Sequence, residues 1–375
     1  MSLIEEVEDK LEEEESIYRK LQQHLDKMPV GFPPTESGVE IRILKHLFTL
    51  EDAKLALNLP LFPEKLNKIY RRLKSTGISK EELEERLDDL VNKGLILGGA
   101  MLKSLGEGKF YGLSVYIAGI FEYQVNKLSK KFMEDYEEYL YNEFLDEYLN
   151  PKTPFQFRTV PVEQSIQHEQ VISTYDDVRQ LIENSEGPFG IANCICKQGK
   201  DLLGQKCVHT DLREVCMQLE EMASHYSNLG LGRIITKEEA LDILRATQDA
   251  GLILQPHNAQ KPLAICACCG DCCQIITSLK MMPKPVEMIS SNYFAEVDFE
   301  TCEGCETCIT RCHMEALSMV NEISHVNLDR CIGCGNCVVL CPSNSIHLVK
   351  KEIETVPPKD AVELLMQINV KKLGS

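Results

Sequence analysis

Two runs of four cysteines with identical spacing lie near the end of this 375-residue chain. Residues 302–312 and residues 331–341 both follow the pattern C-x2-C-x2-C-x3-C. Each cysteine of the first run has a counterpart 29 residues later, and the preceding residues repeat as well, as VDFET and VNLDR. The repeat indicates an internal duplication, and thiols at this density constrain the local fold to loops around bound metal.

The spacing within each run suits a cluster better than a single ion. Three cysteines at i, i+3 and i+6 can wrap one loop around three corners of a cubane. Gly304 and Gly333 would let the backbone approach the cluster and donate N–H groups to its sulfurs. Zinc is the weaker explanation, because zinc sites use pairs of cysteine pairs separated by longer gaps.

Residues 294–350 resemble the two-cluster ferredoxins of bacteria, whose cysteine runs have this spacing. The resemblance implies two 4Fe-4S clusters, in which the fourth cysteine of each run ligates the other cluster. One cluster would be held by Cys302, Cys305, Cys308 and Cys341, and the other by Cys331, Cys334, Cys337 and Cys312. His313 departs from the family, which usually has proline there. We expect a surface residue, and the alternative is that it couples reduction to protonation.

The other nine of the 17 cysteines lie between residues 194 and 273, and none precedes residue 194. In a reducing compartment this density indicates metal binding rather than disulfides. The candidate ligands are Cys194, Cys196, Cys207, Cys216, Cys266, Cys268, Cys269, Cys272 and Cys273. We expect one or two further iron–sulfur centres. Structural zinc and thiol chemistry at the adjacent cysteines are the alternatives.

Two weaker resemblances concern this cysteine-rich segment. The sequence Cys268-Cys269-Gly270 is similar to part of the cysteine-rich domains of heterodisulfide reductases. The flanking cysteines are spaced differently, so that chemistry is not transferred to this chain. A ferredoxin segment joined to a further cysteine-rich region resembles multi-domain iron–sulfur proteins of anaerobes.

The first half of the chain predicts helices followed by a β-hairpin. An amphipathic helix over 3–28 has apolar residues in a heptad-like pattern and packs on its own domain or, alternatively, pairs two copies of the chain. Ser79 and Glu82 form a capping box. This order of elements resembles a winged helix. The expected elements are helices over 39–48, 50–58, 63–74 and 79–93, a hairpin over 95–101 and 110–116, and a long aromatic-rich helix over 120–149.

The charge of this half disfavours nucleic acid as a partner. Residues 1–150 hold 29 acidic and 20 basic side chains, a formal charge of −9. The helix over 79–93, which would enter a DNA groove in a winged helix, carries six acidic residues against three basic ones. Contact with protein is the better role for this domain.

We predict an α+β multidomain protein. It would have a mostly helical winged-helix-like N-terminal domain, a helical cysteine-rich middle domain and a C-terminal ferredoxin-like two-cluster domain. Further helices are expected over 211–228, 236–250 and 360–370. The predicted domains are an amphipathic helix at 1–28, a winged-helix-like domain at 29–160, a cysteine-rich domain at 161–290, a two-cluster domain at 291–350 and a C-terminal docking helix at 351–375.

Electron transfer is the function that these motifs favour. The sequence has no glycine-rich or Walker motif for a nucleotide, and no catalytic residue stands out. The alternatives are an iron–sulfur redox-sensing transcription regulator and a catalytic subunit of an anaerobic oxidoreductase that uses the central cysteines.

Charge and hydropathy add expectations about location and partners. The chain has no membrane-length apolar stretch and begins with an acidic segment unlike a signal peptide, so we expect a cytoplasmic protein. The formal charge is −18. Two oxidised clusters would bring the charge to about −22. We therefore expect redox partner proteins with a basic docking face.

Overall fold

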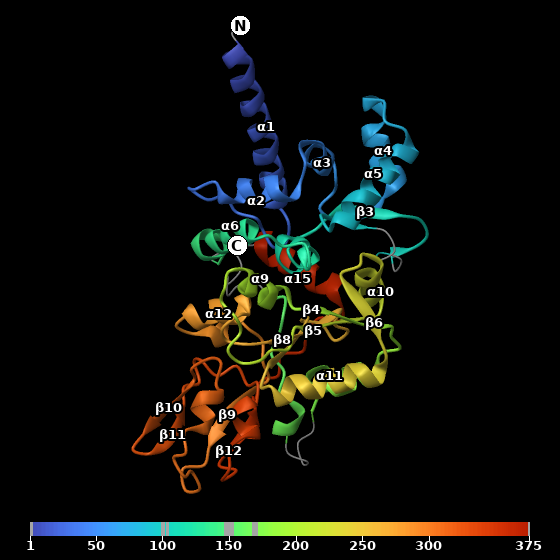
Figure 1. Cartoon of the computed structure of the whole chain (residues 1–375). Helices are drawn as coiled ribbons and strands as arrows, with labels where there is room; N and C mark the ends of the chain where they lie inside the picture. The colour runs from blue at the N-terminus through green and yellow to red at the C-terminus, as the bar shows by residue number, and fades with distance from the viewer. Residues whose placement is uncertain (1–2, 99–101, 103–104, 146–153, 167–171, 374–375) are drawn as a thin grey trace. The chain divides into compact units, whose positions relative to one another are not determined.

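The computed structural model describes residues 3–98, 102, 105–145, 154–166 and 172–373 (Figure 1). Contacts divide the chain into an N-terminal unit, residues 1–148, and a C-terminal unit, residues 149–375. Both units mix helices with antiparallel strands. Among the described residues, no helix is long and apolar enough to cross a membrane.

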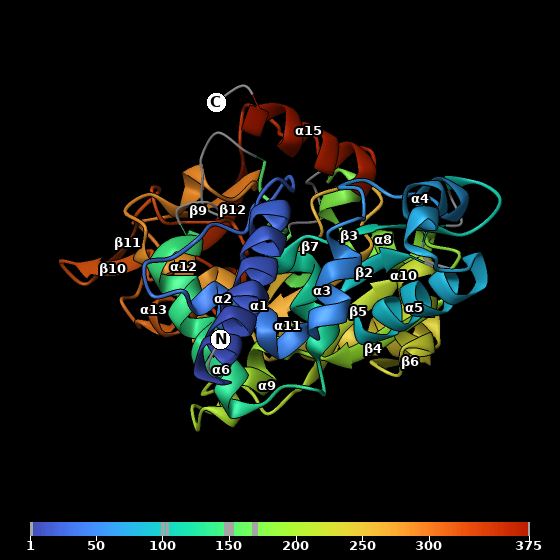
Figure 2. The same cartoon turned by 90° about the horizontal axis from the view of Figure 1, so that it is seen from above.

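Helices make up most of the N-terminal unit. α1 lies beside α2 and α3 (Figure 2) and buries Tyr18, Leu21 and Leu25. The second half of the first predicted helix therefore packs on its own unit. In chain order the elements are α1 (Leu3–Leu25), α2 (Val39–Leu47), α3 (Leu50–Ala56), β1 (Glu64–Lys65), α4 (Leu66–Leu73), α5 (Lys80–Lys93), β2 (Ile96–Gly98), β3 (Phe110–Leu113) and α6 (Lys130–Tyr139).

The N-terminal unit also contains a three-stranded antiparallel sheet in the order β1-β3-β2. The predicted hairpin is confirmed, since Ile96 of β2 pairs with Leu113 of β3. The end of its predicted first strand, residues 99–101, lies outside the described residues. The helix predicted from residue 63 begins only at α4, because the two residues of β1 pair with β3 instead.

α5 begins after Ser79 and ends before Gly94, as predicted. Ser79 Oγ accepts a hydrogen bond of 3.0 Å from the Glu82 N–H, which satisfies one donor of the first turn. The helix ends at Gly94, whose φ of 78° lies in the left-handed region that glycine adopts easily. A side chain at Gly94 would also collide with Tyr123, because a Cβ built there lies 2.3 Å from that residue's Cβ.

The long helix predicted over 120–149 is wrong in its first part. Only Glu122–Gln124 form a short 3-10 helix before the chain turns at Asn126, which has a φ of 65°, and an α-helix begins only with α6. The aromatic residues still pack together: the rings of Phe121 and Tyr136 stack with centroids 3.9 Å apart. Rings on both sides of the turn fill one core, so the apolar pattern is continuous although the helix is not. Residues 146–149 of the predicted helix lie outside the described residues.

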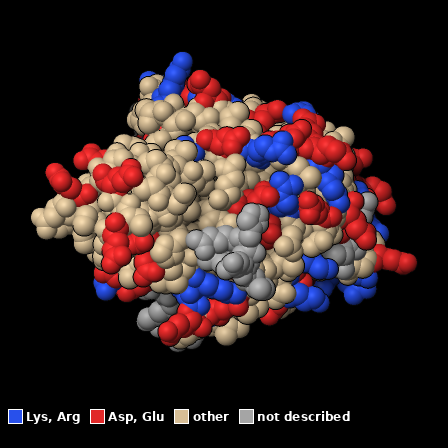
Figure 3. Space-filling view, turned by 90° about the horizontal axis from the view of Figure 1, so that it is seen from below, with Lys and Arg blue, Asp and Glu red and all other residues tan. Residues whose placement is uncertain are grey.

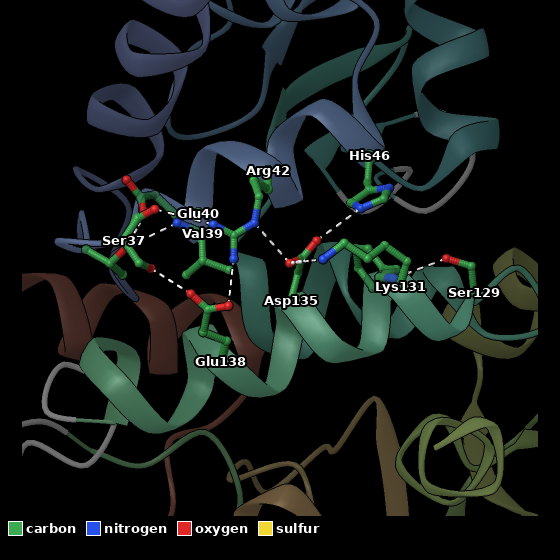
Figure 4. Close-up of polar contacts among 11 residues, drawn as sticks. Ser37, Val39, Glu40, Arg42, His46, Ser129, Lys131, Asp135 and Glu138 are labelled. Carbon is green, nitrogen blue, oxygen red and sulfur yellow. Dashed lines mark hydrogen bonds and ion pairs between the residues drawn. The ribbon is translucent and has the colours of Figure 1, made fainter. Parts of the chain in front are cut away.

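A buried carboxylate joins α2 to α6 (Figure 4). Asp135 is 1% exposed and accepts hydrogen bonds of 3.0 Å from Arg42 Nε and from Lys131 Nζ. His46 Nε2 lies 3.2 Å from its other oxygen. Burial raises the pKa of Asp135, but the bonds from Lys131 and Arg42 outweigh burial, so the pKa is lowered overall. The carboxylate is therefore ionised and holds the two helices together.

The C-terminal unit consists of a mixed helix-and-sheet region, which we call the sheet region, followed by two short strand pairs and a final helix. In chain order its elements are α8 (Val178–Asn184), β4 (Phe189–Asn193), α9 (Ile195–Leu202), β5 (Glu214–Leu219), α10 (Glu221–Asn228), β6 (Gly232–Ile235), α11 (Lys237–Asp249), β7 (Ile253–Pro256), β8 (Ala264–Cys268), α12 (Gln274–Met281), β9 (Tyr293–Val297), α13 (Thr307–Arg311), β10 (Leu317–Val320), β11 (Ile323–Val326), α14 (Asn336–Val339), β12 (Ile346–Lys350) and α15 (Ala361–Leu373).

The prediction that the cysteine-rich middle of the chain is a helical domain is wrong in part. It is built on a five-stranded antiparallel sheet in the order β6-β4-β5-β8-β7. The helix predicted over 211–228 is wrong in its first half, which forms β5 between β4 and β8. Only its second half, α10, is helical. The helix predicted over 236–250 is confirmed as α11, and Thr236 Oγ1 caps it by accepting from the Glu239 N–H.

Two short antiparallel strand pairs form the segment with the cysteine runs. β10 pairs with β11, and β9 pairs with β12, both antiparallel. Each run is a loop that ends in a one-turn helix, α13 or α14. The predicted C-terminal helix is confirmed as α15, which buries Leu364 and Ile368. The segment before α15 is hydrogen-bonded to Gln260 and Lys261 of the sheet region.

Candidate metal centres

The first cysteine run and the last cysteine of the second run surround one small cavity. Cys302, Cys305, Cys308 and Cys341 all line it. Polar groups approach their sulfurs. The Ser324 N–H donates to Cys302 Sγ at 3.5 Å, its hydroxyl lies 3.2 Å from Cys308 Sγ, and a second hydroxyl, that of Ser345, lies 3.4 Å from Cys341 Sγ. Four thiols and these donors fit the surroundings of a 4Fe-4S cluster.

The second cavity has the reciprocal lining. It is bordered by Cys331, Cys334 and Cys337 of the second run and by Cys312 of the first. The Ala316 N–H donates to Cys312 Sγ at 3.3 Å, and the Ala295 N–H donates to Cys331 Sγ at the same distance. Burial raises the pKa of Cys334 to about 12. A thiolate there therefore needs a cation beside it, which the iron of a cluster supplies.

Glycines make both loops possible, although for a different reason from the one expected. Gly304 and Gly333 each have a φ of 67°, in the left-handed region. A Cβ at Gly304 would lie 2.4 Å from the carbonyl oxygen of Glu322, and one at Gly333 only 2.1 Å from that of Tyr293. These carbonyls belong to the protein's own backbone. The glycines therefore allow the loops to press against neighbouring segments as well as to face the cavities.

The two cavities differ in their surroundings. Cys305 beside the first cavity is exposed, and residues 296–306 carry acidic side chains but no lysine or arginine. The exposed acidic residues are Glu296, Asp298, Glu300, Glu303 and Glu306. The left part of the space-filling view, where this segment lies, shows mainly Asp and Glu among uncharged residues (Figure 3). The second cavity instead adjoins the sheet region, because the Cys334 carbonyl accepts a hydrogen bond from the Val162 N–H at 3.0 Å.

His313 is buried, so the expectation of a surface residue is wrong. Its Nδ1 accepts a hydrogen bond of 3.2 Å from the Gly270 N–H, which leaves the proton on Nε2. Nε2 lies 2.8 Å from the Gly251 carbonyl oxygen, to which it donates. Burial lowers the pKa of His313 to about 4, so the imidazole is neutral at pH 7. Located directly after Cys312, it links the ferredoxin-like segment to the loop that contains Gly270.

Six of the nine central cysteines gather at one end of the five-stranded sheet. We call them the six-thiol group: Cys194, Cys196, Cys216, Cys266, Cys268 and Cys273. Strand pairing places two of these cysteines side by side, because Cys216 of β5 lies directly opposite Cys266 of β8. Cys194 and Cys273 immediately precede α9 and α12.

The thiols of this group influence one another's ionisation. Hydrogen bonds from Cys196 and Cys268 lower the pKa of Cys273 to about 6, although burial opposes them. Hydrogen bonds from Cys216 and Cys268 likewise lower the pKa of Cys266. Contacts of the same kind, together with burial, raise the pKa values of Cys194, Cys196 and Cys268. Ionisation of the group is therefore concentrated on Cys266 and Cys273, and thiolates are the form that binds metal.

The other three central cysteines form a separate site with an aspartate, which we call the Cys207 site. It consists of Cys207, Cys269, Asp271 and Cys272, whose ligand atoms all lie within 4.8 Å of one another. Lys197, only 1% exposed, donates hydrogen bonds to Cys269 Sγ at 3.1 Å and to Cys207 Sγ at 3.3 Å. The hydrogen bond from Cys272 is the main reason why the pKa of Cys269 falls to about 6, and Lys197 lowers it further.

The sequence did not reveal two of these residues, Asp271 and Lys197. Asp271 lies inside a C-x-x-C sequence, and Lys197 directly follows the C-x-C at 194–196. A charged residue next to cysteines could have indicated a role at the site. Neither residue belongs to a known ligand motif, however, so the sequence did not single them out. The grouping of the nine cysteines into six and three depends on strand pairing, which the sequence analysis had missed.

The comparisons with known proteins concern the cysteine runs. Residues 295–342 match the family model of the 4Fe-4S dicluster domain. The chain contains a 4Fe-4S dicluster domain. The domain implies two 4Fe-4S clusters, and the Cys207 site is a further possible metal site. Searches of curated proteins and of solved structures found no match to the chain.

Proposed function

We propose that this chain is an electron-transfer iron–sulfur protein. The observation that carries the proposal is the reciprocal lining of the two cavities, each with three cysteines of one run and the fourth of the other. The clusters, when bound, supply reversible one-electron transfer. The proposed ligands are Cys302, Cys305, Cys308 and Cys341 for the first cluster and Cys331, Cys334, Cys337 and Cys312 for the second.

The unequal surroundings of the two cavities favour a direction for the relay. The first cavity lies beside the exposed Cys305 and the acidic residues of 296–306, which suits docking of a redox partner with a basic face. The second cavity is attached to the sheet region through Val162 and His313. Electrons would therefore be exchanged with the partner at the first cluster and with the central cysteines through the second.

The six-thiol group is the proposed site of a third iron–sulfur centre. Four thiolates hold one 4Fe-4S cluster, so six leave two to spare. Two of the six ionise readily, and the group lies at one end of a sheet that fixes Cys216 opposite Cys266. A centre there would extend the relay into the middle of the C-terminal unit.

Anaerobic purification of the full chain, followed by iron and sulfide analysis and electron paramagnetic resonance, tests this function. We expect at least about eight iron atoms per chain for two clusters, and about twelve with the third centre. Chemical reduction should give the spectrum of interacting clusters. A content below about eight iron atoms, or clusters that cannot be reduced, would overturn the proposal.

Serine variants test the exchange of ligands between the runs. Cys341→Ser and Cys302→Ser should change the same cluster signal, although the two residues belong to different runs. Cys312→Ser should instead change the signal that Cys334→Ser changes. If Cys341→Ser affected the Cys334 cluster, the proposed ligand sets would be wrong while two-cluster electron transfer could still hold.

A second candidate, a redox-sensing regulator, rests on the N-terminal unit. The order helix, helix, strand, helix, helix, hairpin, with the sheet order β1-β3-β2, is typical of a winged helix. The acidic surface of α5, including exposed Glu81, Glu82 and Glu85, favours protein over DNA. Binding to duplex DNA at low salt would support the regulator, whereas no binding in either redox state would exclude it.

A further inference from the structure

We infer that Cys207, Cys269, Cys272 and Asp271 form a mononuclear zinc site, separate from every iron–sulfur centre of the chain. The inference does not depend on electron transfer by the dicluster domain. It rests on the spacing of the four donor atoms, on their charge balance and on their burial.

Two of the distances between the donors are close to those around a single ion, and all of them are 4.8 Å or less. A tetrahedral zinc with Zn–S bonds of about 2.3 Å and a Zn–O bond of about 2.0 Å has S···S edges of about 3.8 Å and S···O edges of about 3.5 Å. Cys207 Sγ lies 3.7 Å from Cys269 Sγ and 3.6 Å from Asp271 Oδ1. In a cubane each thiolate binds a different iron atom, so the sulfurs stand farther apart.

The dicluster domain provides an internal comparison. Throughout residues 302–341, all of which the structure describes, no two of the eight thiols are hydrogen-bonded to each other, and they surround two cavities. At the Cys207 site, by contrast, two thiols and a carboxylate are already in contact. Contact between thiols also occurs in the six-thiol group. What sets the Cys207 site apart is that it has only three thiols, too few for the four thiolates of a 4Fe-4S cluster, together with a carboxylate at 3.6 Å from one of them.

Charge and orientation agree with a bound cation. Asp271 Oδ2 accepts a hydrogen bond of 2.7 Å from the Val208 N–H, which turns Oδ1 toward the sulfurs. Three thiolates and one carboxylate around Zn²⁺ have a net charge of −2. Lys197 offsets part of this charge from a buried position in which both of its hydrogen-bond acceptors are sulfurs of the site.

Burial argues against the competing role of a reactive dithiol. Cys269 and Cys272 form a C-x-x-C pair, a spacing that also occurs in disulfide oxidoreductases. Both are only 1% exposed, so a disulfide of another protein could not reach either sulfur. A closed set of three thiols and a carboxylate matches a structural ion better than a nucleophile.

Metal analysis and zinc-edge X-ray absorption of the full chain, purified without oxygen in zinc-supplemented medium, test the inference. We expect one zinc per chain in addition to the iron, with three sulfur ligands at about 2.3 Å and one oxygen at about 2.0 Å. Absence of zinc, iron in its place, or a Cys269–Cys272 disulfide in the anaerobic protein would overturn it.

Three variants separate this site from the clusters. Asp271→Cys should keep the zinc and change its environment to four sulfurs, a readout that a misfolded protein cannot give. Cys308→Ser, the control, should lose iron and sulfide but keep the zinc. If Cys207→Ser removed iron and sulfide instead of zinc, the Cys207 site would belong to a cluster. A low iron content with zinc retained would count only against the electron-transfer proposal.

Discussion

The dicluster domain and the central cysteines bind their proposed metals by opposite means. In the dicluster domain the ligands come from two loops of fixed spacing, and the thiols stand apart around cavities. At the Cys207 site one ligand comes from the loop after α9 and three come from the turn after β8, with their donor atoms nearly in contact. Ligand spacing along the chain therefore defines the clusters, whereas tertiary folding defines the central sites.

The largest expected effect is the loss of a cluster when Gly333 is replaced, which tests whether the loops of the dicluster domain depend on close backbone packing. In Gly333→Ala the added Cβ would meet the Tyr293 carbonyl oxygen at 2.1 Å, in addition to being strained by the left-handed φ. The loop that carries Cys331, Cys334 and Cys337 should be displaced. We expect loss of one cluster, about four iron atoms and four sulfides per chain. The loss of the cluster is measured by analysis of iron, sulfide and zinc.

The matched control is Gly204→Ala. Gly204 has a similar φ of 78°, but nothing lies within 4 Å of a Cβ built there. It should show only the backbone strain, about 1–2 kcal/mol, with full iron content. Equal iron loss in both variants would mean that φ strain, not the close approach to Tyr293, controls cluster binding.

The next effect concerns the Cys207 site. In Asp271→Asn one oxygen remains, but the charge that helps to hold a cation is lost, so we expect zinc to pass to a chelator roughly tenfold faster or more. The iron content should stay unchanged. Asp211→Asn removes an exposed carboxylate near the same loop and should have no effect. Equal rates for wild type and Asp271→Asn would show that the carboxylate is not a ligand.

These predictions also show how far the sequence alone could go. The eight dicluster cysteines were predictable, because the ligands of each run are close together in the sequence and follow a spacing that is typical of cluster-binding loops. The division of the other nine was not, because it depends on β5 pairing with β8. The helix predicted over 211–228 includes the residues of β5, and this error conceals the pairing of Cys216 with Cys266. His313 was misjudged because its two partners, Gly251 and Gly270, are distant in sequence.

A smaller effect is expected where the two regions meet. His313→Phe keeps a buried ring but leaves the Gly270 N–H and the Gly251 carbonyl without their partner, which costs about 1–3 kcal/mol for each buried group. Chemical denaturation of the anaerobic protein measures the loss. His347→Phe, at a half-buried position in β12, is the control and should cost less. If both variants were equally stable, His313 would not be what joins the dicluster domain to the sheet region.

The smallest effect is a pH dependence located in the sheet region. Burial lowers the pKa of His225 in α10 from 6.5 to about 4, so the folded protein binds its proton less readily than the unfolded chain does. The associated stability is complete above pH 6.5 and is lost as the pH falls toward 4. Between pH 7.5 and pH 5.0 we expect this histidine alone to cost about 2 kcal/mol.

The His225→Gln variant isolates that contribution, because glutamine keeps polar groups but does not titrate in this range. The free energy of unfolding, measured by denaturant at both pH values, should fall less in His225→Gln than in the wild type, by the same amount of about 2 kcal/mol. Thiolates and carboxylates titrate equally in both proteins, so their effects cancel in the difference. An identical pH dependence would mean that the imidazole is hydrated or already charged in the folded state.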